Sequence, residues 1–261
     1  MKPDEYRKMF DVEDTHWWYV ALHEHIARIV AAECQRRGSL LLFDAGCGTG
    51  RLCRVLSPYG AVSGCDGSDE AIALCRQRGL TQVHRSDLNT IDLGIERYDI
   101  ITSIDVLCQR QIDDDLSVCR KFLDALRPGG LLVLQVPAYE WLRSSHDDAV
   151  QTGRRYTRSG VVSMLRSSGF FVERATYRVG LFFLPIAALR TLGNLMRRLT
   201  GRSPSGSDVK QHSIIVNRVL LAIMRFENAV LSRMTLPFGT SLFMLGRKKT
   251  AGATPKAGSG K

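Results

Sequence analysis

The sequence predicts an α/β fold built on a doubly wound, seven-stranded, mostly parallel sheet. Three observations lead to this fold class: short apolar runs alternate with helical segments as far as Ala138, a glycine-rich turn follows the first run, and acidic residues follow several later ones. The chain has 261 residues, of which 44% are hydrophobic and 24% are charged. This is an ordinary globular composition in a chain long enough to bury a sizeable core.

Apolar runs predict the strands, and residues typical of helix ends bound the helices. Strands are predicted over residues 40–43, 61–65, 81–87, 98–104, 131–136, 170–178 and 240–246. Helices are predicted over residues 51–56, 70–78, 114–126 and 158–168. The third helix is followed by Arg127, Pro128, Gly129 and Gly130, a combination that strongly favours a helix end.

The turn after the first strand reads LLLFDAGCGTG, in which Asp44 precedes glycines at positions 46, 48 and 50. Glycine lets a ligand approach the main chain closely, and the helix that follows directs its N-terminus at that ligand. Dinucleotide-binding loops use G-x-G-x-x-G, in which the third glycine comes three residues after the second, whereas here it comes two residues after. A loop whose glycines serve turn geometry alone is the other alternative.

This turn resembles the first motif of the class I S-adenosylmethionine-dependent methyltransferases, in the branch of ubiquinone/menaquinone-type and related small-molecule enzymes. The resemblance implies S-adenosyl-L-methionine as the cofactor and an antiparallel last strand. The second strand ends at Asp66, where an acid can accept hydrogen bonds from both hydroxyls of a ribose. A helix cap is the alternative role for Asp66, although Ser68 and Asp69 are better placed to cap the next helix. The expected cofactor residues here are Asp44, Gly46, Gly48, Gly50, Asp66 and Gly67.

Two later strand ends complete the expected cofactor site. In the family, the position of Asp87, followed by Leu88, contacts the adenine amino group, whereas the alternative for Asp87 is a turn aspartate before Asn89. The position of Asp105 lies beside the methionine part of the cofactor in the family. Relatives often carry Glu-His where this chain has Cys108 and Gln109, so no role is transferred to that pair.

The cysteines and the first residues indicate the compartment. Seven cysteines lie within the first 120 residues without a C-x-x-C pair, which is typical of reduced thiols in a cytoplasmic protein. No metal site is expected. Residues 1–14 contain acids and no apolar segment, so no secretory signal peptide is expected there.

Charge is distributed unevenly along the chain, which has a net charge of +10. Residues 151–261 contain 19 Lys/Arg and 3 Asp/Glu, whereas residues 1–150 contain 17 and 23. A polycationic second half favours anionic partners, and anionic lipid, a phosphate-bearing substrate and nucleic acid all qualify.

We predict four parts along the chain. Residues 1–38 form an N-terminal cap helix, residues 39–179 and 237–249 the catalytic domain, residues 180–236 a basic apolar helical insertion, and residues 250–261 a flexible tail. Within the insertion, two helices over residues 181–199 and 212–234 are expected to form an antiparallel hairpin, joined by a Gly/Ser/Pro-rich link over residues 201–208.

The first insertion helix is too short and too charged to span a membrane, because such a span needs about 20 apolar residues. A helix lying in the membrane interface fits better, on the cytoplasmic face; a hydrophobic lid and a dimer surface are the alternatives. In the membrane arrangement, the residues expected to be buried in the apolar part of the interface are Phe182, Phe183, Leu184, Ile186, Leu189 and Leu192. Arg190, Arg197 and Arg198 are expected to face the headgroups.

Two segments are expected to form the acceptor site beyond the carboxyl ends of the strands. In the N-terminal segment, Trp17 and Trp18 either cover the active site or anchor a helix on the sheet. In the loop after the fifth strand, His146 is the candidate general base and Asp147 the acid that holds it, and a surface or capping role is the alternative. The remaining substrate candidates in that loop are Tyr139, Arg154, Arg155 and Tyr156, with the two arginines suited to a phosphate or carboxylate. Relatives share an acid-His-Trp-Trp segment and a His-Asp then Arg-Arg-Tyr arrangement.

Three functions follow from these observations. The first is methylation, most simply O-methylation, of a small-molecule, sugar or lipid-linked acceptor. The second is nucleic-acid methylation, which only the positive charge supports, since residues 104–107 read Ile-Asp-Val-Leu where base methyltransferases of this superfamily carry Asn/Asp-Pro-Pro-aromatic. The third is a non-catalytic cofactor-binding scaffold, which the complete set of cofactor motifs disfavours.

Overall fold

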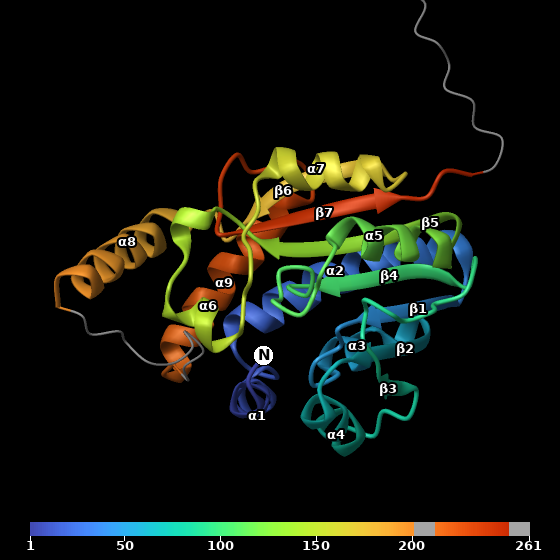
Figure 1. Ribbon diagram of the computed structural model, residues 1–261, viewed down its shortest axis with the longest axis horizontal. Coiled ribbons are helices and arrows are strands. Elements are labelled where there is room, and N and C mark those ends of the chain that lie inside the picture. The colour runs from blue at the N-terminus through green and yellow to red at the C-terminus, as the bar shows by residue number, and fades with distance from the viewer. Residues whose placement is uncertain (201–211, 251–261) are drawn as a thin grey trace, which may run out of the picture.

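The computed structural model describes residues 1–200 and 212–250, except for the side chains of residues 197–199. It contains one seven-stranded sheet in the order β3-β2-β1-β4-β5-β7-β6 (Figure 1). The strands are β1 (Leu40–Ala45), β2 (Gly60–Asp66), β3 (Val83–Arg85), β4 (Tyr98–Ile104), β5 (Leu126–Pro137), β6 (Phe171–Arg178) and β7 (Ser241–Arg247). The predicted fold class is confirmed.

Strand pairing is parallel everywhere except around β7. β1 pairs in parallel with β2 and β4, and β4 pairs in parallel with β5. β7 runs antiparallel between β5 and β6, as the family resemblance implied. Because the carboxyl ends of β1, β2 and β4 lie at one edge, the acids that follow these strands gather there.

Helices cover both faces of the sheet. On one face, α2 (Trp17–Arg37) and α3 (Arg51–Leu56) contribute Leu22, Ile26 and Leu52 to a core with Leu131 and Val133 of β5. On the other face, α5 (Asp115–Ala125) and α7 (Arg158–Ser167) pack on the next residues of β5, among them Leu132. This alternation of neighbouring side chains between two apolar layers explains the continuous apolar run of the strand.

The N-terminal segment forms two helices where the sequence analysis expected one cap helix. α1 (Pro3–Val12) packs against α4 (Asp69–Gln77), where Tyr6 contacts Ala71 and Leu74. α2 then crosses the sheet. The two helices together cover the carboxyl edge of β1 and β2.

The insertion contains α8 (Phe183–Thr200) and α9 (Ile214–Leu231), at the predicted positions. The expected packed hairpin is wrong for the described residues: α9 lies along α2, whereas α8 projects away from the body of the molecule (Figure 1). The physical reason is that the buried face of α9 finds its partners on α2 and β6, where Asn228 donates to the Ala21 carbonyl oxygen at 2.7 Å and accepts from Arg178 at 3.2 Å. The predicted link over residues 201–208 and the tail after residue 250 lie outside the described residues.

Two element boundaries differ from the prediction. β5 begins at Leu126, so the Arg-Pro-Gly-Gly segment expected to close a helix also opens a strand, with an irregular register against β4. β3 spans three residues instead of seven. Two short elements, η2 (Glu140–Leu142) and α6 (Ser145–Ala149), lie in the loop after β5. Among the described residues, no helix is both long and apolar enough to cross a bilayer.

Candidate active site

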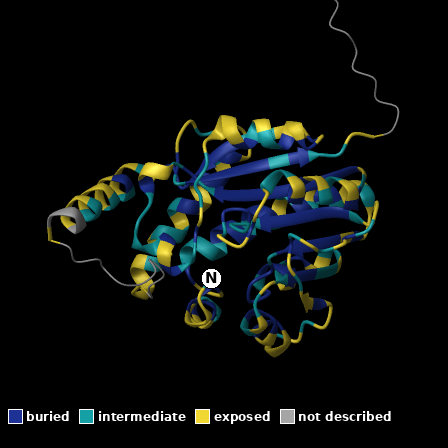
Figure 2. Cartoon of the chain, viewed as in Figure 1, coloured by how far each residue is buried: buried dark blue, intermediate teal, exposed yellow. Residues whose placement is uncertain are grey.

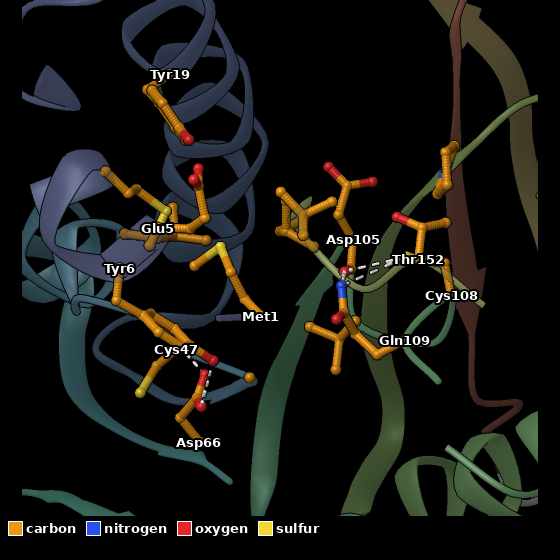
Figure 3. Close-up of a pocket in the computed structure, with 18 of the residues that line it drawn as sticks. Met1, Glu5, Tyr6, Tyr19, Cys47, Asp66, Asp105, Cys108, Gln109 and Thr152 are labelled. Atoms are coloured by element: carbon orange, nitrogen blue, oxygen red, sulfur yellow. Dashed lines mark hydrogen bonds between the residues drawn. The ribbon is translucent and has the colours of Figure 1, made fainter. Parts of the chain in front are cut away.

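A cavity of about 740 Å³ lies at the carboxyl edge of β1, β2 and β4. Its floor is the glycine loop and the ends of these strands, and its cover is made by α1, the start of α2 and the loop after β5. Figure 3 shows Met1, Glu5, Tyr6 and Tyr19 of the N-terminal segment facing Asp105, Gln109 and Thr152 across this space. The cavity therefore lies between segments that are far apart in the sequence.

The glycine loop forms the floor through backbone conformations that favour glycine. Gly46 and Gly48 have φ angles of 77° and 56°, and both line the cavity. A Cβ atom on Gly46 would lie 2.3 Å from Cγ2 of Val106, so a side chain there would collide with that valine. Gly50 begins α3 at a φ of 79°, and its missing side chain makes room for Leu80 and Cys75, away from the cavity. Gly50 thus shapes the loop rather than lining the cavity.

Asp44 lies beneath the loop at 3% exposure and also lines the cavity. Its carboxylate accepts hydrogen bonds from Thr102 Oγ1 at 2.6 Å and Cys53 Sγ at 3.5 Å. Burial raises the pKa of Asp44 to about 6, although these two donors oppose the shift. Asp44 therefore ties β1 to β4 at the point where the loop begins.

Asp66, at the end of β2, accepts three hydrogen bonds of 3.0 Å each. The donors are the backbone amides of Gly48 and Ser68 and the hydroxyl of Tyr6. Ser68 itself caps α4 by accepting from the Ala71 amide, so the cap role that was the alternative for Asp66 falls to Ser68. Asp66 and Gly67 both line the cavity.

Asp87 and Leu88 line the cavity where β3 leads into its loop. Asp87 Oδ1 accepts from both the amide and the side chain of Asn89 at 2.9 Å. Asp87 therefore stabilises a turn before Asn89, which was the alternative role considered for it, and this turn lies at the cavity wall.

Asp105 follows β4 with a φ of 55°, a conformation that is uncommon for a residue with a side chain. Its Oδ2 accepts from Gln135 Nε2 at 3.0 Å, whereas its buried Oδ1 has no hydrogen-bond partner among the described residues. Burial raises the pKa of Asp105. An unsatisfied buried carboxylate oxygen in a cavity wall favours a ligand group that is positively charged or donates a hydrogen bond.

The start of α2 brings His16, Trp17 and Trp18 to the cavity. His16 caps the helix by accepting from the Trp18 amide at 3.3 Å, and burial lowers the pKa of His16 to about 4. The Trp17 amide donates to Asn217 of α9 at 2.9 Å, and Trp18 packs on the α2 core layer. Trp18 thus anchors the helix on the sheet, and both tryptophans also line the cavity.

The loop after β5 places His146, Asp147 and Arg155 on the cavity wall. The last two form a bidentate ion pair: Arg155 Nε lies 2.8 Å from Asp147 Oδ1, and Nη2 lies 3.1 Å from Oδ2. Their side chains are only 3% and 1% exposed. Arg155 also donates to the Ala138 carbonyl oxygen, and Asp147 accepts from the Ser144 amide. The pair thus holds the loop together, whereas a contact with a phosphate or carboxylate of the substrate was predicted for Arg155.

Three of the predicted substrate residues lie away from the cavity. Arg154 forms an ion pair with Asp115 of α5 at 2.9 Å, and the Tyr156 hydroxyl donates to the same carboxylate at 2.7 Å. Tyr139 stacks on Tyr177 with ring centroids 5.3 Å apart. These side chains attach the loop to α5 and β6, because both elements present partners that the sequence pattern does not reveal.

Comparison with known proteins identifies the central part of this fold. Residues 43–134, from β1 to β5, match the family model described as "Methyltransferase domain". This part of the chain is therefore a methyltransferase domain, and its fold is that of the class I S-adenosylmethionine-dependent methyltransferases. Its cofactor is accordingly S-adenosylmethionine.

Individual relatives of this methyltransferase are distant. It is 30% identical over 132 residues to an uncharacterized 37.1 kDa protein in transposon TN4556 of Streptomyces fradiae, and the match covers 48% of this chain and 37% of that protein. The chain thus matches well under half the length of this curated relative. Among solved structures, it resembles an S-adenosylmethionine-dependent methyltransferase from Mesorhizobium loti, with a TM-score of 0.55, 20% identity and coverage of 90% and 99%. The YcgJ protein from Bacillus subtilis gives a TM-score of 0.57 at 14% identity, with coverage of 88% and 100%. These structures share the fold.

The cavity fits the chemistry of this cofactor. The open backbone of Gly46 and Gly48 suits close approach, Asp66 and Asp87 suit hydroxyl and amino donors, and the unsatisfied oxygen of Asp105 suits a cationic ammonium group. When bound, S-adenosylmethionine supplies a methyl group attached to a positively charged sulfur. Burial lowers the pKa of His23 to about 3, so the imidazoles of His16 and His23 are neutral near pH 7 and add no repelling charge.

Several lining residues of the methyltransferase were not predicted from the sequence. One group of them comes from the N-terminal segment: Met1, Glu5, Tyr6, Met9, Glu13, Tyr19 and His23. α1 is held over the cavity by Tyr6 on Asp66 and by Glu13, which accepts from Thr49 of the glycine loop and pairs with Arg78 at 2.8 Å. The only available signal was the amphipathic pattern of residues 3–12, which does not say what the helix covers.

Proposed function

We propose that this methyltransferase transfers the methyl group of S-adenosylmethionine to a hydroxyl oxygen of a small-molecule or lipid-linked acceptor. One observation carries the proposal: a single cavity runs from the cofactor-side acids to His146, Trp17 and the α8 residues Ile186 and Arg190. Its volume of about 740 Å³ lies in the upper part of the range of roughly 300–1,000 Å³ typical of small-molecule sites. Such a cavity can hold the cofactor together with part of an acceptor.

The residues around the acceptor end are suited to methyl transfer. Trp17, Trp18 and α1 cover the cavity, and this cover would exclude water from the transfer step. Alignment of the acceptor oxygen is the main requirement of the reaction, and a base that takes its proton assists it. We assign that role to His146, since its side chain belongs to the cavity wall on the loop that the Arg155–Asp147 pair holds in place.

We place the activity in the cytoplasm, because all seven cysteines are unpaired thiols. Six of them are buried, and burial raises the pKa of Cys108, so this thiol next to Asp105 is a poor nucleophile. This favours direct transfer to the acceptor over a route through a cysteine.

The test is incubation of the purified chain with methyl-labelled S-adenosylmethionine and fractionated cell extract, followed by mass spectrometry of labelled products. We expect label in a small-molecule or lipid fraction, with the Asp66→Ala variant abolishing it. The His146→Gln variant should lower kcat by about 10² to 10⁴, the range for general acid–base groups, while the Kd for S-adenosylmethionine stays unchanged.

Two outcomes would contradict the proposal. Label confined to polynucleotide would support a nucleic-acid methyltransferase instead, and absence of any labelled product with intact cofactor binding would support a scaffold role. A His146→Gln variant with unchanged kcat would leave the methyl transfer standing but remove His146 as its base.

A further inference from the structure

Most of the large exposed apolar side chains in the described part of the chain lie on the insertion. They cover much of the surface of α8 and α9, where Figure 2 shows many residues as exposed. We call this set the insertion surface: Leu184, Leu189, Leu192, Leu195 and Met196 on α8, and Ile214, Ile215, Val216, Val219 and Phe226 on α9. Leu184 and Ile215 are 73% and 76% exposed. Exposed apolar side chains gathered in this number on two neighbouring helices of the sequence favour an interaction site.

The periodicity of α9 shows that it has two different faces. Ile215, Val219 and Phe226 follow one another at spacings of four and seven residues, which places them on a common face of the helix. The opposite face carries Met224 and Asn228, which are fully buried against the rest of the protein. The exposed apolar face is therefore additional to the packing that holds the helix in the fold.

The charges of the insertion itself that reach the surface have one sign. Over residues 181–200 and 212–236, the described cationic side chains that reach the surface are Arg190, Arg218, Arg225 and Arg233, of which Arg225 is paired with Glu24 of α2 at 2.5 Å. The acid in these ranges, Glu227, is 1% exposed and accepts from the amides of Val179, Gly180 and Leu181. The outer face of the described insertion is consequently apolar and positive.

We propose that α8 and α9 dock on the surface of an anionic lipid bilayer. The apolar side chains enter the interfacial region while the arginines contact headgroups, the arrangement in which amphipathic helices lie on membranes. A second copy of the chain is a poorer occupant, since a twofold contact through this surface would bring like charges together. The docking does not depend on the methylation reaction.

Membrane docking has a consequence for the site, because α8 is shared. Ile186 and Arg190 of this helix line the cavity, and the exposed residues of the same helix form the insertion surface. A docked α8 therefore places the acceptor end of the cavity next to the headgroups. An acceptor carried on a lipid would reach the cavity from that side.

Vesicle flotation of the full chain tests the docking. We expect it to float with vesicles of phosphatidylcholine and phosphatidylglycerol, and only weakly with phosphatidylcholine alone. The combined variant Ile215→Ser, Val219→Ser, Phe226→Ser should lower the partition coefficient at least about tenfold, because apolar insertion is lost. Arg218→Gln should lower it by about fivefold. The matched controls are Ile95→Ser, at an isoleucine that is 78% exposed in the turn before β4, and Arg76→Gln on α4, and both should float as the parent does.

Three results would overturn the proposal. The chain could stay unbound with anionic vesicles, the combined variant could float as well as the parent, or sedimentation could show a dimer that the same variant dissociates. The last result would assign the surface to a second copy. Binding of S-adenosylmethionine by calorimetry, which should be unchanged in every variant, separates loss of docking from loss of the fold or of the cofactor site.

Discussion

Two loops of this methyltransferase follow strand ends at the same sheet edge, yet they are held in different ways. The cofactor loop, residues 44–50 after β1, is shaped by glycine conformations and by backbone hydrogen bonds such as those from Gly46 and Cys47 to the Cys65 carbonyl oxygen. The acceptor loop, residues 138–156 after β5, is held by arginine side chains. Arg143 donates to the carbonyl oxygens of Thr152 and Gly153, and Arg155 binds Asp147 and the Ala138 carbonyl oxygen.

The comparison of the two loops shows that a glycine in a tight turn indicates its own role, whereas an arginine in a long loop does not. A glycine needed for a left-handed conformation sits where the turn itself requires it, so its purpose is local. A guanidinium in a long loop has several donors that can bind either a ligand or the loop's own carbonyl oxygens. In the acceptor loop the arginines bind the protein. Long loops of this kind need such internal partners because they lack a regular hydrogen-bond ladder.

The largest expected effect is at the centre of the acceptor loop. Arg155→Gln would leave the buried carboxylate of Asp147 without its cation, and breaking a buried pair costs about 3–5 kcal/mol of unfolding free energy. Denaturant unfolding measures the loss. The control is Arg110→Gln, whose pair with Asp148 is more than half exposed on both sides and should cost less than about 1 kcal/mol. Equal losses in the two variants would show that Arg155 does not hold this loop.

A smaller effect is expected beneath the cofactor loop, through the pKa of Asp44. Burial raises this pKa to about 6 in the folded chain, above the usual value near 4, so ionisation of Asp44 opposes folding. The cost is absent below about pH 4, grows through the window up to pH 6, and is complete above it. Asp44→Asn should therefore gain stability relative to the parent as pH rises from 4 to 7.5, by at most about 3 kcal/mol. Unfolding free energies across that pH range would measure it, and a constant or falling difference would contradict the assignment.

The smallest effect concerns the link between the cofactor loop and its cover. Tyr6→Phe removes the hydroxyl that joins α1 to Asp66. A hydrogen bond to a charged group contributes about 1.5–3 kcal/mol, so the loss of this one, which holds the cover over the cavity, should weaken cofactor binding about tenfold. Calorimetry with S-adenosylmethionine measures the change. The control is Tyr59→Phe, in η1 (Ser57–Tyr59) away from the cavity, which should bind as the parent does. Tighter binding by Tyr6→Phe would show that Tyr6 competes with the cofactor for Asp66.

Sequence patterns were sufficient to predict the strands of the sheet and most of the residues that line the cofactor side of the cavity. Asp44, Gly46, Gly48, Asp66, Asp87 and Asp105 all line one cavity, because parallel strands bring their carboxyl ends to one edge whatever the loops do. Gly50 was an exception: it does not line the cavity, and its missing side chain makes room for Leu80 and Cys75. On the acceptor side, Trp17, Trp18, His146, Asp147 and Arg155 reach the cavity, whereas Tyr139, Arg154 and Tyr156 find partners on α5 and β6.

The linear chain alone indicated the seven strands and most of the helices, the glycine turn and the acids at several strand ends, and with them the resemblance that implied the family and its cofactor. These features depend on periodicity and on spacing between near neighbours, which are written directly in the sequence. Only the tertiary structure decided that α1 covers the cofactor loop, that α9 packs on α2 and leaves α8 projecting, and that Arg155 binds Asp147. Each of these is a contact between distant segments, selected by which buried partners are available once the sheet has formed, and no local pattern carries that information.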